Sequence, residues 1–325
     1  MKNLRVAVLR GGPSDEYDVS MQTGGGVLAA IDRAQFDPLD VIITRGGEWL
    51  YDGREWFPEQ LLALVDVVFI ALHGAFGEDG KVQRILERYN VPYTGSGPYA
   101  SSMAMNKTLT KDFLRDHDVR MPPHMLVTSE ARGNTHRMAS AIGNMFGPEY
   151  VIKPVNSGSS VGVMMVQNAM LLPRALDDAL KTYDQVLVEK RIPGREATCG
   201  VMNRFRDHEI YTLPPVEIVP PKNSDYFDFN VKYDGSTEEI CPGRFTRSEK
   251  EDMERVAALV HDKLGLSQYS RSDFMVTESG VYFLEVNTLP GLTSESLFPK
   301  SITAVGSSYE ELVNHLIADA LERRT

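Results

Sequence analysis

The chain has 325 residues, a formal net charge of -11 and a sequence pI near 5.2. Its 42% hydrophobic and 24% charged residues are typical of a folded globular protein and argue against a disordered one. A strongly acidic chain repels nucleic acid and anionic membrane surfaces, so we expect neither as a partner. The length allows two or three domains.

The cysteines and the apolar segments place limits on the cellular compartment. Cys199 and Cys241 cannot form a disulfide framework, and neither has His or Cys neighbours at metal-ligand spacing. The apolar stretch 6–9 is too short for a signal peptide, and the longest apolar run, 61–72, contains a charged residue, Asp66. We therefore expect a cytoplasmic protein with two free thiols.

The first hundred residues predict alternating strands and helices. The expected strands are 6–9, 39–44, 65–72 and 91–94, and the expected helices are 20–30 and 81–89. The run 65–72 is almost wholly apolar, which indicates a strand buried on both faces. This alternation predicts an α/β domain over residues 1–104, in which a Rossmann-like parallel sheet carries helices on both faces.

The remaining chain predicts two α+β subdomains, 105–192 and 193–325. The expected strands are 125–127, 150–153, 161–166, 186–189, 272–277 and 281–286, and the expected helices are 107–117, 171–181, 248–264 and 309–323. Ser248 is the predicted cap of the helix 248–264. The polar, aromatic-rich stretch 222–236 shows no periodicity, and long irregular stretches of this kind often serve as functional lids.

An acidic hairpin near the C-terminus predicts a metal site. Two strand-like runs flank a short loop that ends in Gly280, and a three-residue loop centred on Ser279 would place Asp273 opposite Glu285. Asn287 lies two residues beyond Glu285 and so projects from the same face. Two carboxylates and an amide suit Mg²⁺ or Mn²⁺, usually shared with the phosphates of a nucleotide.

A solvated polar strand face is the alternative interpretation of this hairpin. In the assumed register, Val281 and Phe283 share the face of Glu285, and the adjacent strand is also apolar. A carboxylate pair buried among apolar side chains needs a cation, so we favour the metal site.

The segment 150–163 predicts a phosphate loop. A strand ends in Lys153, the small-residue loop 154–160 follows, and a return strand begins at Val161. Small residues let backbone N–H groups approach phosphate oxygens, and the lysine supplies charge. By itself this pattern fits an ordinary polar hairpin about as well.

Two other glycine-rich motifs do not fit nucleotide sites. The segment 74–81 resembles a P-loop, but it has one residue too many and lacks the Ser or Thr. The segment 95–100 matches G-x-G-x-x-A after a short strand, but no acid follows at the position that binds a ribose. A dinucleotide site is therefore not expected.

Four motifs in order resemble signatures of the D-alanine–D-alanine ligase family, over almost the whole chain. They are Gly11-Gly12-Pro13-Ser14-Asp15-Glu16-Tyr17-Asp18-Val19-Ser20, His73-Gly74 with Gly77-Glu78-Asp79-Gly80, Lys153-Pro154 to Gly162, and Arg271 to Asn287 followed by Thr288-Leu289-Pro290-Gly291-Leu292-Thr293. The resemblance implies a three-domain ATP-grasp fold, with ATP sandwiched between the second and third domains, and a homodimer.

The resemblance also implies roles for residues around ATP. Lys107 and Lys153 would bind phosphates; Glu189 and the backbone of Lys190 and Ile192 would read adenine; Glu196 would lie near the ribose; Lys232 would approach the γ-phosphate; Asp273, Glu285 and Asn287 would hold two Mg²⁺ or Mn²⁺ ions.

On the substrate side, the family pattern assigns residues to both D-alanines. Glu16 would hold the ammonium group of the first D-alanine, with His73 nearby; Arg271 and the backbone N–H of Gly291 would form an oxyanion hole; Ser296 and Leu297 would receive the second D-alanine; Ser159, Glu196 and Tyr233 would form a hydrogen-bonded set that closes the lid. The implied reaction joins two D-alanines through an acyl-phosphate, gives ADP and phosphate, and serves peptidoglycan synthesis.

Taken singly, several of these residues have ordinary explanations. Glu16 could be a solvated loop residue, His73 a structural histidine and Lys107 a surface residue. Their joint order along the chain favours the functional interpretation. Two features depart from the family or lack an explanation: the lid has Phe227 and Phe229 where tyrosines are usual, and the triple glycine 24–26 has no evident cause.

Three alternative functions remain open. A ligase that uses D-lactate as second substrate usually replaces the lid tyrosine, so Tyr233 favours the dipeptide product. An ATP-grasp ligase for other amino acids is disfavoured by Glu16 and His73. A catalytically silent regulator would be expected to lose a metal ligand or Arg271, and all are present.

Overall fold

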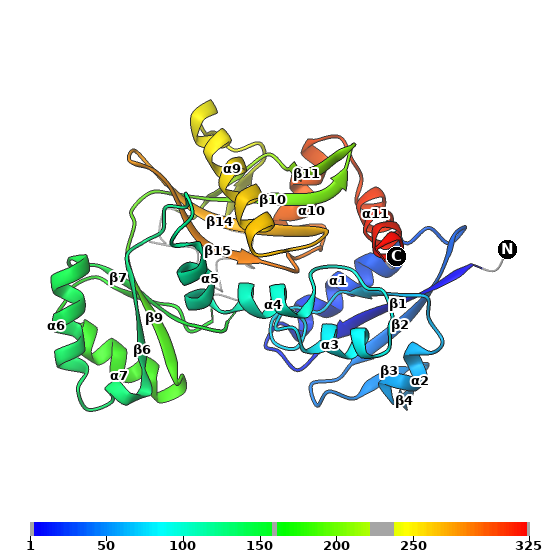
Figure 1. The fold of residues 1–325 in the computed structure, drawn as a ribbon, viewed down its shortest axis with the longest axis horizontal. Helices are drawn as coiled ribbons and strands as arrows, with labels where there is room; N and C mark the ends of the chain where they lie inside the picture. Colours follow the sequence, from blue (N-terminus) through cyan, green and yellow to red (C-terminus); the bar gives the residue numbers. More distant parts are fainter. Residues whose placement is uncertain (1–2, 158–160, 222–236, 324–325) are drawn as a thin grey trace.

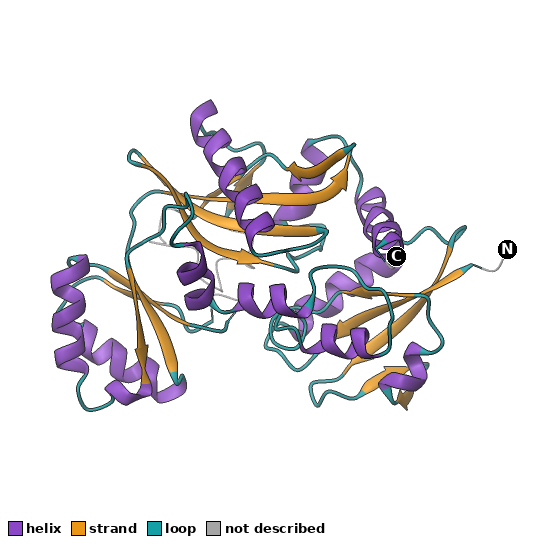
Figure 2. Ribbon diagram, viewed as in Figure 1, coloured by secondary structure: helices purple, strands orange, loops and turns teal. Residues whose placement is uncertain are grey.

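The computed structural model describes residues 3–157, 161–221 and 237–323, which form three sheets with helices packed on them (Figures 1 and 2). Ser159, Lys232, Tyr233 and the predicted lid 222–236 lie outside these ranges. Within the described residues, every helix is too short or too polar to span a bilayer. The predicted domain boundaries at 104 and 192 stay a prediction.

The N-terminal sheet has the strand order β4-β3-β2-β1-β5. Its strands are β1 (Leu4–Gly11), β2 (Phe36–Ile43), β3 (Trp49–Tyr51), β4 (Arg54–Trp56) and β5 (Val67–Ile70). β1 pairs in parallel with β2 and β5, as predicted, whereas β3 and β4 add an antiparallel extension that the sequence interpretation missed. The predicted strand 91–94 forms only a single bridge, between Tyr93 and Val68.

Helices cover this first sheet. They are α1 (Tyr17–Ala30), α2 (Pro58–Leu62), α3 (Lys81–Arg88) and, from the end of the chain, α11 (Tyr309–Glu322). Helix α4 (Pro98–Met105) packs instead between α3 and the core of the C-terminal sheet. Leu312 and Leu316 of α11 join Val27 and Phe69 in one buried core, and Figure 1 shows α11 beside α1. The C-terminal helix therefore packs with the N-terminal sheet, although more than two hundred residues separate them in the sequence.

Close packing explains Gly24, the first residue of the triple glycine in α1. A Cβ at Gly24 would lie 2.5 Å from Cβ of Arg10 on β1, and one at Gly26 would lie 3.2 Å from the hydroxyl of Tyr309. A Cβ at Gly25 would meet no atom within 4 Å. Gly24 thus lets α1 approach the sheet closely, and that close approach outweighs the lower helix propensity of glycine.

The central sheet is antiparallel, with the order β6-β9-β7-β8. Its elements are β6 (His124–Thr128), η1 (Ser129–Ala131), α6 (Thr135–Phe146), β7 (Tyr150–Pro154), β8 (Met164–Val166), α7 (Leu172–Thr182) and β9 (Gln185–Lys190). Tyr150 and Ile152 face the core that α6 and α7 cover. Because side chains alternate along a strand, Lys153 on β7 projects from the opposite face.

The C-terminal sheet has the order β13-β12-β10-β14-β15, with β11 paired to β10. Its elements are β10 (Arg195–Phe205), β11 (His208–Thr212), β12 (Val216–Val219), β13 (Glu238–Ile240), α9 (Arg247–Lys263), β14 (Tyr269–Thr277), β15 (Gly280–Asn287) and α10 (Leu297–Ala304). Thr246, and not the predicted Ser248, caps α9, through a capping box with Glu249.

Buried hydrogen bonds fasten the C-terminal sheet to the N-terminal one. The Gln268 side chain accepts a hydrogen bond from Gly95 N (2.7 Å) and donates one to Asp319 on α11 (2.7 Å). Arg323, at the end of α11, donates to the carbonyl of Tyr93 (2.9 Å) and so holds that helix on the N-terminal part. These groups are satisfied only when both parts are docked, so their geometry fixes the space between the two sheets.

Candidate active site

The β14–β15 hairpin confirms the predicted pairing of Asp273 with Glu285, but by a different route. Thr277 pairs with Gly280, so the turn contains two residues, where three were predicted. A register shift between Asp273 and Phe274 then restores the opposition of Asp273 and Glu285.

This bulge also changes which side chains share a face. Val281 and Phe283 are buried in the core beneath α9, together with Val286. Strict alternation would have kept the first two on the face of Glu285, so that expectation was wrong. The bulge separates the apolar side of β15 from the polar side that carries Glu285 and Asn287.

Asp273 lies at the centre of a polar cluster. Arg271 donates to both of its carboxylate oxygens, from Nε (2.8 Å) and Nη2 (3.0 Å). The hydroxyl of Thr198 on β10 (2.8 Å) and Nδ2 of Asn287 (3.1 Å) also donate to it. Burial works to lower the pKa of Arg271, but Asp273 and Glu285 outweigh it and raise that pKa. Arg271 therefore carries a permanent charge.

Lys107 joins the hairpin to the central subdomain. As the first residue of α5 (Lys107–Leu114), it follows the cap Asn106, whose side chain accepts from Leu109 N. Its ammonium group lies 3.2 Å from Oε2 of Glu285 and also donates to the carbonyl of Ser157, in the predicted phosphate loop 154–160. The structure thus brings the lysine, the loop and one proposed metal ligand together.

A second buried cluster contains Glu189. Its carboxylate lies 2.9 Å from the ammonium group of Lys111 and 2.8 Å from that of Lys153, with one oxygen toward each. Burial works to raise the pKa of Glu189, but the two lysines outweigh it and lower that pKa to about 2. Burial lowers the pKa of Lys111. At Lys153 it acts the same way, but Glu189 and Glu285 outweigh it and raise the pKa.

The expected adenine hinge begins at Glu189 and continues through Lys190 to Ile192. The backbone N–H of Lys190 donates to the carbonyl of Pro123 (2.8 Å), and that of Arg191 donates to the carbonyl of Glu149 (3.0 Å). Ile192 comes next, and Glu196 lies at the start of β10, beside Met275 of β14 and Ile218 of β12. The hinge therefore connects the central sheet to the C-terminal one.

His73 is held in place as a neutral imidazole. Nδ1 donates to the carbonyl of Leu289 (3.1 Å), and the hydroxyl of Thr23 lies 2.8 Å from Nε2. Since a carbonyl can only accept, the proton is on Nδ1, and Nε2 accepts from the threonine. Burial lowers the pKa of His73 to about 4, so the ring is uncharged at neutral pH.

Glu78 fixes the relative position of two loops. Its carboxylate accepts from the backbone N–H of Gly74 (2.9 Å) and from that of Leu289 (3.2 Å). Glu16 approaches the same loop, because a Cβ on Gly74 would lie 2.7 Å from its Oε2. The sequence interpretation treated Glu78 only as part of a motif, and only the structure shows the two loops that it joins.

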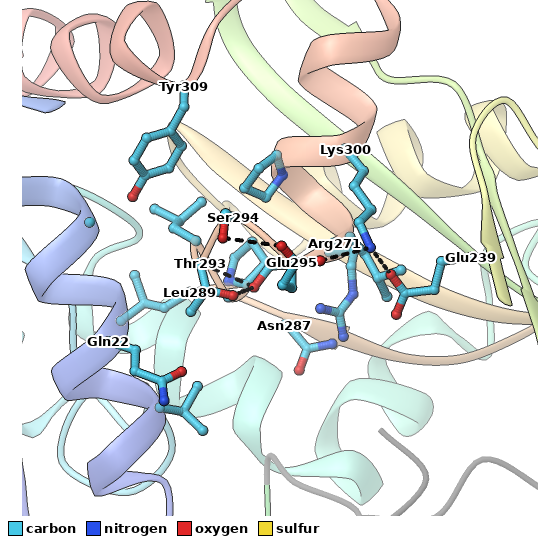
Figure 3. Close-up of a pocket in the computed structure, with 18 of the residues that line it drawn as sticks. Gln22, Glu239, Arg271, Asn287, Leu289, Thr293, Ser294, Glu295, Lys300 and Tyr309 are labelled. Atoms are coloured by element: carbon cyan, nitrogen blue, oxygen red, sulfur yellow. Dashed lines mark hydrogen bonds and ion pairs between the residues drawn. The ribbon is translucent and has the colours of Figure 1, made fainter. Parts of the chain in front are cut away.

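A pocket of about 1370 Å³ lies between α1 and the C-terminal sheet. It is lined by predicted site residues from distant segments: Glu16, His73, Glu196, Arg271, Asp273, Asn287, Gly291, Ser296 and Leu297. Figure 3 shows Gln22 approaching from α1 on one side, with Arg271, Asn287 and Lys300 across the space. The predicted substrate residues thus share one cavity with two of the three proposed metal ligands.

The loop after β15 forms one wall of this pocket. A Cβ on Gly291 would lie 2.8 Å from Oγ of Ser296, so a larger residue there would require the serine side chain to shift. The Ser296 hydroxyl oxygen accepts from Thr293 N (3.1 Å), and Leu297 begins α10. Lys300, one turn later, pairs with Glu239 on β13 at 2.7 Å.

The side-chain oxygens of Asp273, Glu285 and Asn287 on the hairpin fit the ligands of a divalent metal ion that is shared with a nucleotide. Across residues 3–157, 161–221 and 237–323, no group of three or more His, Cys, Asp or Glu side chains gathers as a metal site. Asp273, Glu285 and Asn287 together offer two carboxylates and one amide oxygen. Such a set suits Mg²⁺, which binds through one or two carboxylates and takes its other ligands from phosphates and water.

Lys111 is the principal buried residue that the sequence interpretation missed. A lysine in a helix is normally exposed, so nothing in the composition of α5 indicated burial. The available signal was its spacing of four residues from Lys107, which places both side chains on one helix face. Its partner Glu189 lies on a distant strand and could not be identified from spacing.

Solved structures of the same shape identify the class of protein. The chain superposes with a TM-score of 0.86 on a D-Ala:D-Ser ligase from Enterococcus faecalis, at 29% identity, covering 98% of this chain and 100% of that one. It superposes with a TM-score of 0.80 on a D-alanine–D-alanine ligase from Bacillus anthracis, at 31% identity, covering 99% and 98%. The fold is that of the ATP-grasp ligases.

Sequence comparisons narrow the class to one family. Residues 5–60 and 51–96 match the model described as D-ala D-ala ligase N-terminus, and residues 113–318 match the one described as D-ala D-ala ligase C-terminus. A D-alanine–D-alanine ligase of Geobacter sulfurreducens is 38% identical, covering 98% of this chain and 95% of the relative. The chain belongs to the D-alanine–D-alanine ligase family.

Proposed function

We propose that this protein joins two D-alanines to D-alanyl-D-alanine at the cost of one ATP, for the synthesis of peptidoglycan precursors. The observation that carries the proposal is the shared pocket, which brings Glu16 and His73 of the first domain beside Arg271, Gly291 and Ser296 of the last. Full-length relatives named D-alanine–D-alanine ligase, and a Bacillus anthracis relative complexed with ATP, support this assignment.

The reaction begins with activation of the first carboxylate, because a carboxylate ion is a poor electrophile. Glu16 holds the ammonium group of the first D-alanine, and neutral His73 lies beside it. One carboxylate oxygen attacks the γ-phosphorus of ATP; the new O–P bond forms as the bond to the β-phosphate oxygen breaks, and ADP leaves. Lys107 and Lys153 stabilise the charge on the phosphates, with Lys232 as a further candidate in the lid.

In the second step the amine of the second D-alanine attacks the acyl carbon. The C–N bond forms, the C–O bond to phosphate breaks, and the proton lost by the nitrogen leaves with the phosphate. Arg271 and the backbone N–H of Gly291 stabilise the oxyanion of the tetrahedral intermediate, while Ser296 and Leu297 hold the acceptor. Ser159, Glu196 and Tyr233 are assigned to lid closure, which would keep water from the acyl-phosphate.

For nucleotide binding, we assign adenine recognition to Glu189 and the backbone of Lys190 and Ile192. We assign two Mg²⁺ or Mn²⁺ ions to Asp273, Glu285 and Asn287. When bound, these ions would neutralise phosphate charge. We further propose a cytoplasmic homodimer, in line with the family pattern.

Phosphate release with different amino acids tests the proposal. The protein is incubated with Mg²⁺ and ATP together with D-alanine, L-alanine, or D-alanine plus D-lactate or D-serine. We expect phosphate release with D-alanine alone and little phosphate release with L-alanine. In the mixtures, D-alanyl-D-alanine should exceed any product that contains D-lactate or D-serine. Release that is independent of D-alanine would contradict the assignment, and a predominant D-alanyl-D-lactate product would favour the depsipeptide alternative.

D-serine is included as an acceptor because of one specific finding. A solved structure that superposes well on this chain is that of a D-Ala:D-Ser ligase. The two acceptors differ by a single hydroxyl group, and a pocket that does not bond that hydroxyl discriminates weakly. The acceptor experiment therefore decides between D-alanine and D-serine at the same site.

A further inference from the structure

Helix α5 presents two lysines to two different sheets. Lys107 and Lys111 are four residues apart and project from one face of the helix. The first pairs with Glu285 on β15, at 3.2 Å, and the second pairs with Glu189 on β9, at 2.9 Å. Figure 1 shows α5 between the central lobe and the C-terminal sheet. One face of this short helix therefore reaches a carboxylate on each side of the proposed ATP site.

The ion pair of Lys111 with Glu189 is almost completely buried. The side chain of Lys111 is only 1% exposed and that of Glu189 only 3%. The ammonium group also lies 6.0 Å from the ring centre of Phe283 on β15. Burying an ion pair costs desolvation energy that its attraction often fails to recover, so an apolar residue would serve packing equally well. The charge at Lys111 therefore calls for a reason other than stability.

The arrangement around Glu189 suggests that reason. Lys111 and Lys153 each approach a separate oxygen of this carboxylate. Lys153 stands at the end of β7, directly before the loop where phosphates are expected. If Lys153 turns to a phosphate, Glu189 loses one of these two cationic neighbours. Lys111 comes from a different element and can stay in place during that exchange.

We propose that Lys111 is a positioning residue for ATP, which holds the Glu189 carboxylate so that Lys153 is free to bind phosphate. The inference rests on the proposed function, since it takes Lys153 as a phosphate ligand. In the absence of Lys111, only Lys153 of the two lysines would remain beside Glu189. ATP would then have to break a buried Lys153–Glu189 pair before it could engage Lys153.

Nucleotide affinity in charge variants of Lys111 tests this role. Lys111→Met keeps the length of the side chain and removes its charge, whereas Lys111→Arg keeps the charge. Titration of the full chain with ADP and Mg²⁺ should show affinity about tenfold weaker in Lys111→Met, and within about threefold of wild type in Lys111→Arg. The KM for D-alanine should stay within about twofold of wild type in both, because Lys111 acts on the nucleotide.

Arg115→Met is the matched control. This residue follows the same helix, and its side chain is 67% exposed. Loss of an exposed cation should change ADP affinity by less than about twofold. A folded Lys111→Met variant with unchanged ADP affinity would overturn the proposal, as would an equal loss in the Arg115→Met control.

A second comparison asks whether Lys111 acts through Glu189, and it holds even if Lys111→Met folds poorly. In the Glu189→Gln background the competing carboxylate is gone, so adding Lys111→Met leaves no unpaired buried acid. Because Glu189 is also assigned to adenine, the double variant is compared with Glu189→Gln alone. We expect this addition to weaken ADP binding by less than about twofold. The same loss in both backgrounds would overturn the proposal. Absence of ADP binding in wild type would instead refute the proposed function.

Discussion

The carboxylates of Asp273 and Glu285 stand opposite each other on paired strands, and each has its own cation. Arg271 bonds both oxygens of Asp273, and Lys107 lies 3.2 Å from Glu285. Two carboxylates directly opposite each other on paired strands would destabilise the hairpin if neither had a cation beside it. Each acid at the centre of the site is therefore held beside a positive charge from a different residue.

The first prediction concerns Glu285 as a metal ligand. Glu285→Ala should reduce phosphate release at least about 100-fold while the protein stays folded, because a bound metal contributes several kcal/mol to charge stabilisation. Chelation of divalent ions should abolish the activity of the wild type, and Mg²⁺ or Mn²⁺ should restore it. Glu278→Ala, in the exposed turn of the same hairpin, is the control. Full activity in Glu285→Ala would refute the metal assignment.

The second prediction concerns Glu78 and the two loops that it joins. Glu78→Gln turns an amide N–H₂ group toward one of the two backbone donors, Gly74 N or Leu289 N. One buried donor then loses its acceptor, which costs about 1–3 kcal/mol. Denaturant unfolding should show this loss, and the KM for D-alanine should rise because His73 bonds the same Leu289. Glu55→Gln, on an exposed strand, should have neither effect.

The third prediction distinguishes the glycines of α1. Gly24→Ala should destabilise the protein by about 1–3 kcal/mol, because its Cβ has to displace Arg10 or the helix backbone. Gly25→Ala meets no atom within 4 Å and should stabilise by about 0.4–1 kcal/mol. Urea unfolding of both variants measures the difference. Equal effects of the two substitutions would argue against close packing of α1 on β1.

The fourth prediction concerns stability in mild acid. Burial lowers the pKa values of His73 and His261 to about 4, from 6.5 in the unfolded chain. Between these values the unfolded state binds more protons than the folded state, so stability should fall as pH drops from 6.5 toward 4. Each histidine can account for about 3 kcal/mol over that range. Unfolding midpoints measured from pH 7 to pH 4 test this.

A single substitution separates the contribution of His261. Its Nε2 donates to Oδ1 of Asn203 (3.0 Å), and Nδ1 faces the hydroxyl of Ser270 (2.8 Å). In His261→Gln the amide can still donate to Asn203 but does not titrate. This variant should therefore lose less stability between pH 6.5 and 4 than the wild type. An unchanged slope would show that other groups control the acid response.

Local patterns predicted the hairpin that carries Asp273 and Glu285, and in part its pairing, but not β10, β12, β13 or α10, which also line the pocket. The residues around Gly280 indicated two paired strands, and this placed Asp273 opposite Glu285. The bulge before Phe274 was not predictable, because alternation assumes an unbroken register. The register shift allows Phe283 to pack into the core beneath α9 while Glu285 stays on the polar face. This packing involves residues far away in the sequence, so local alternation could not predict it.

Other features could not be predicted because they depend on contacts between distant segments. α6 was overlooked, although Ala139, Ile142 and Phe146 have helical spacing and are buried. The ion pairs of Glu189 with Lys111 and Lys153 join three separate elements. No spacing rule relates such residues, so their burial and partners became visible only in the folded structure.

The transfer of oxygen from D-alanine to phosphate tests the central claim most directly. D-alanine labelled with ¹⁸O in its carboxylate is incubated with the protein, ATP and Mg²⁺, and the phosphate is analysed by mass spectrometry. If the first carboxylate is phosphorylated and then attacked by the second amine, each phosphate carries one ¹⁸O atom and each ADP matches one dipeptide. Dipeptide formed with unlabelled phosphate, or label found in AMP, would contradict activation through an acyl-phosphate.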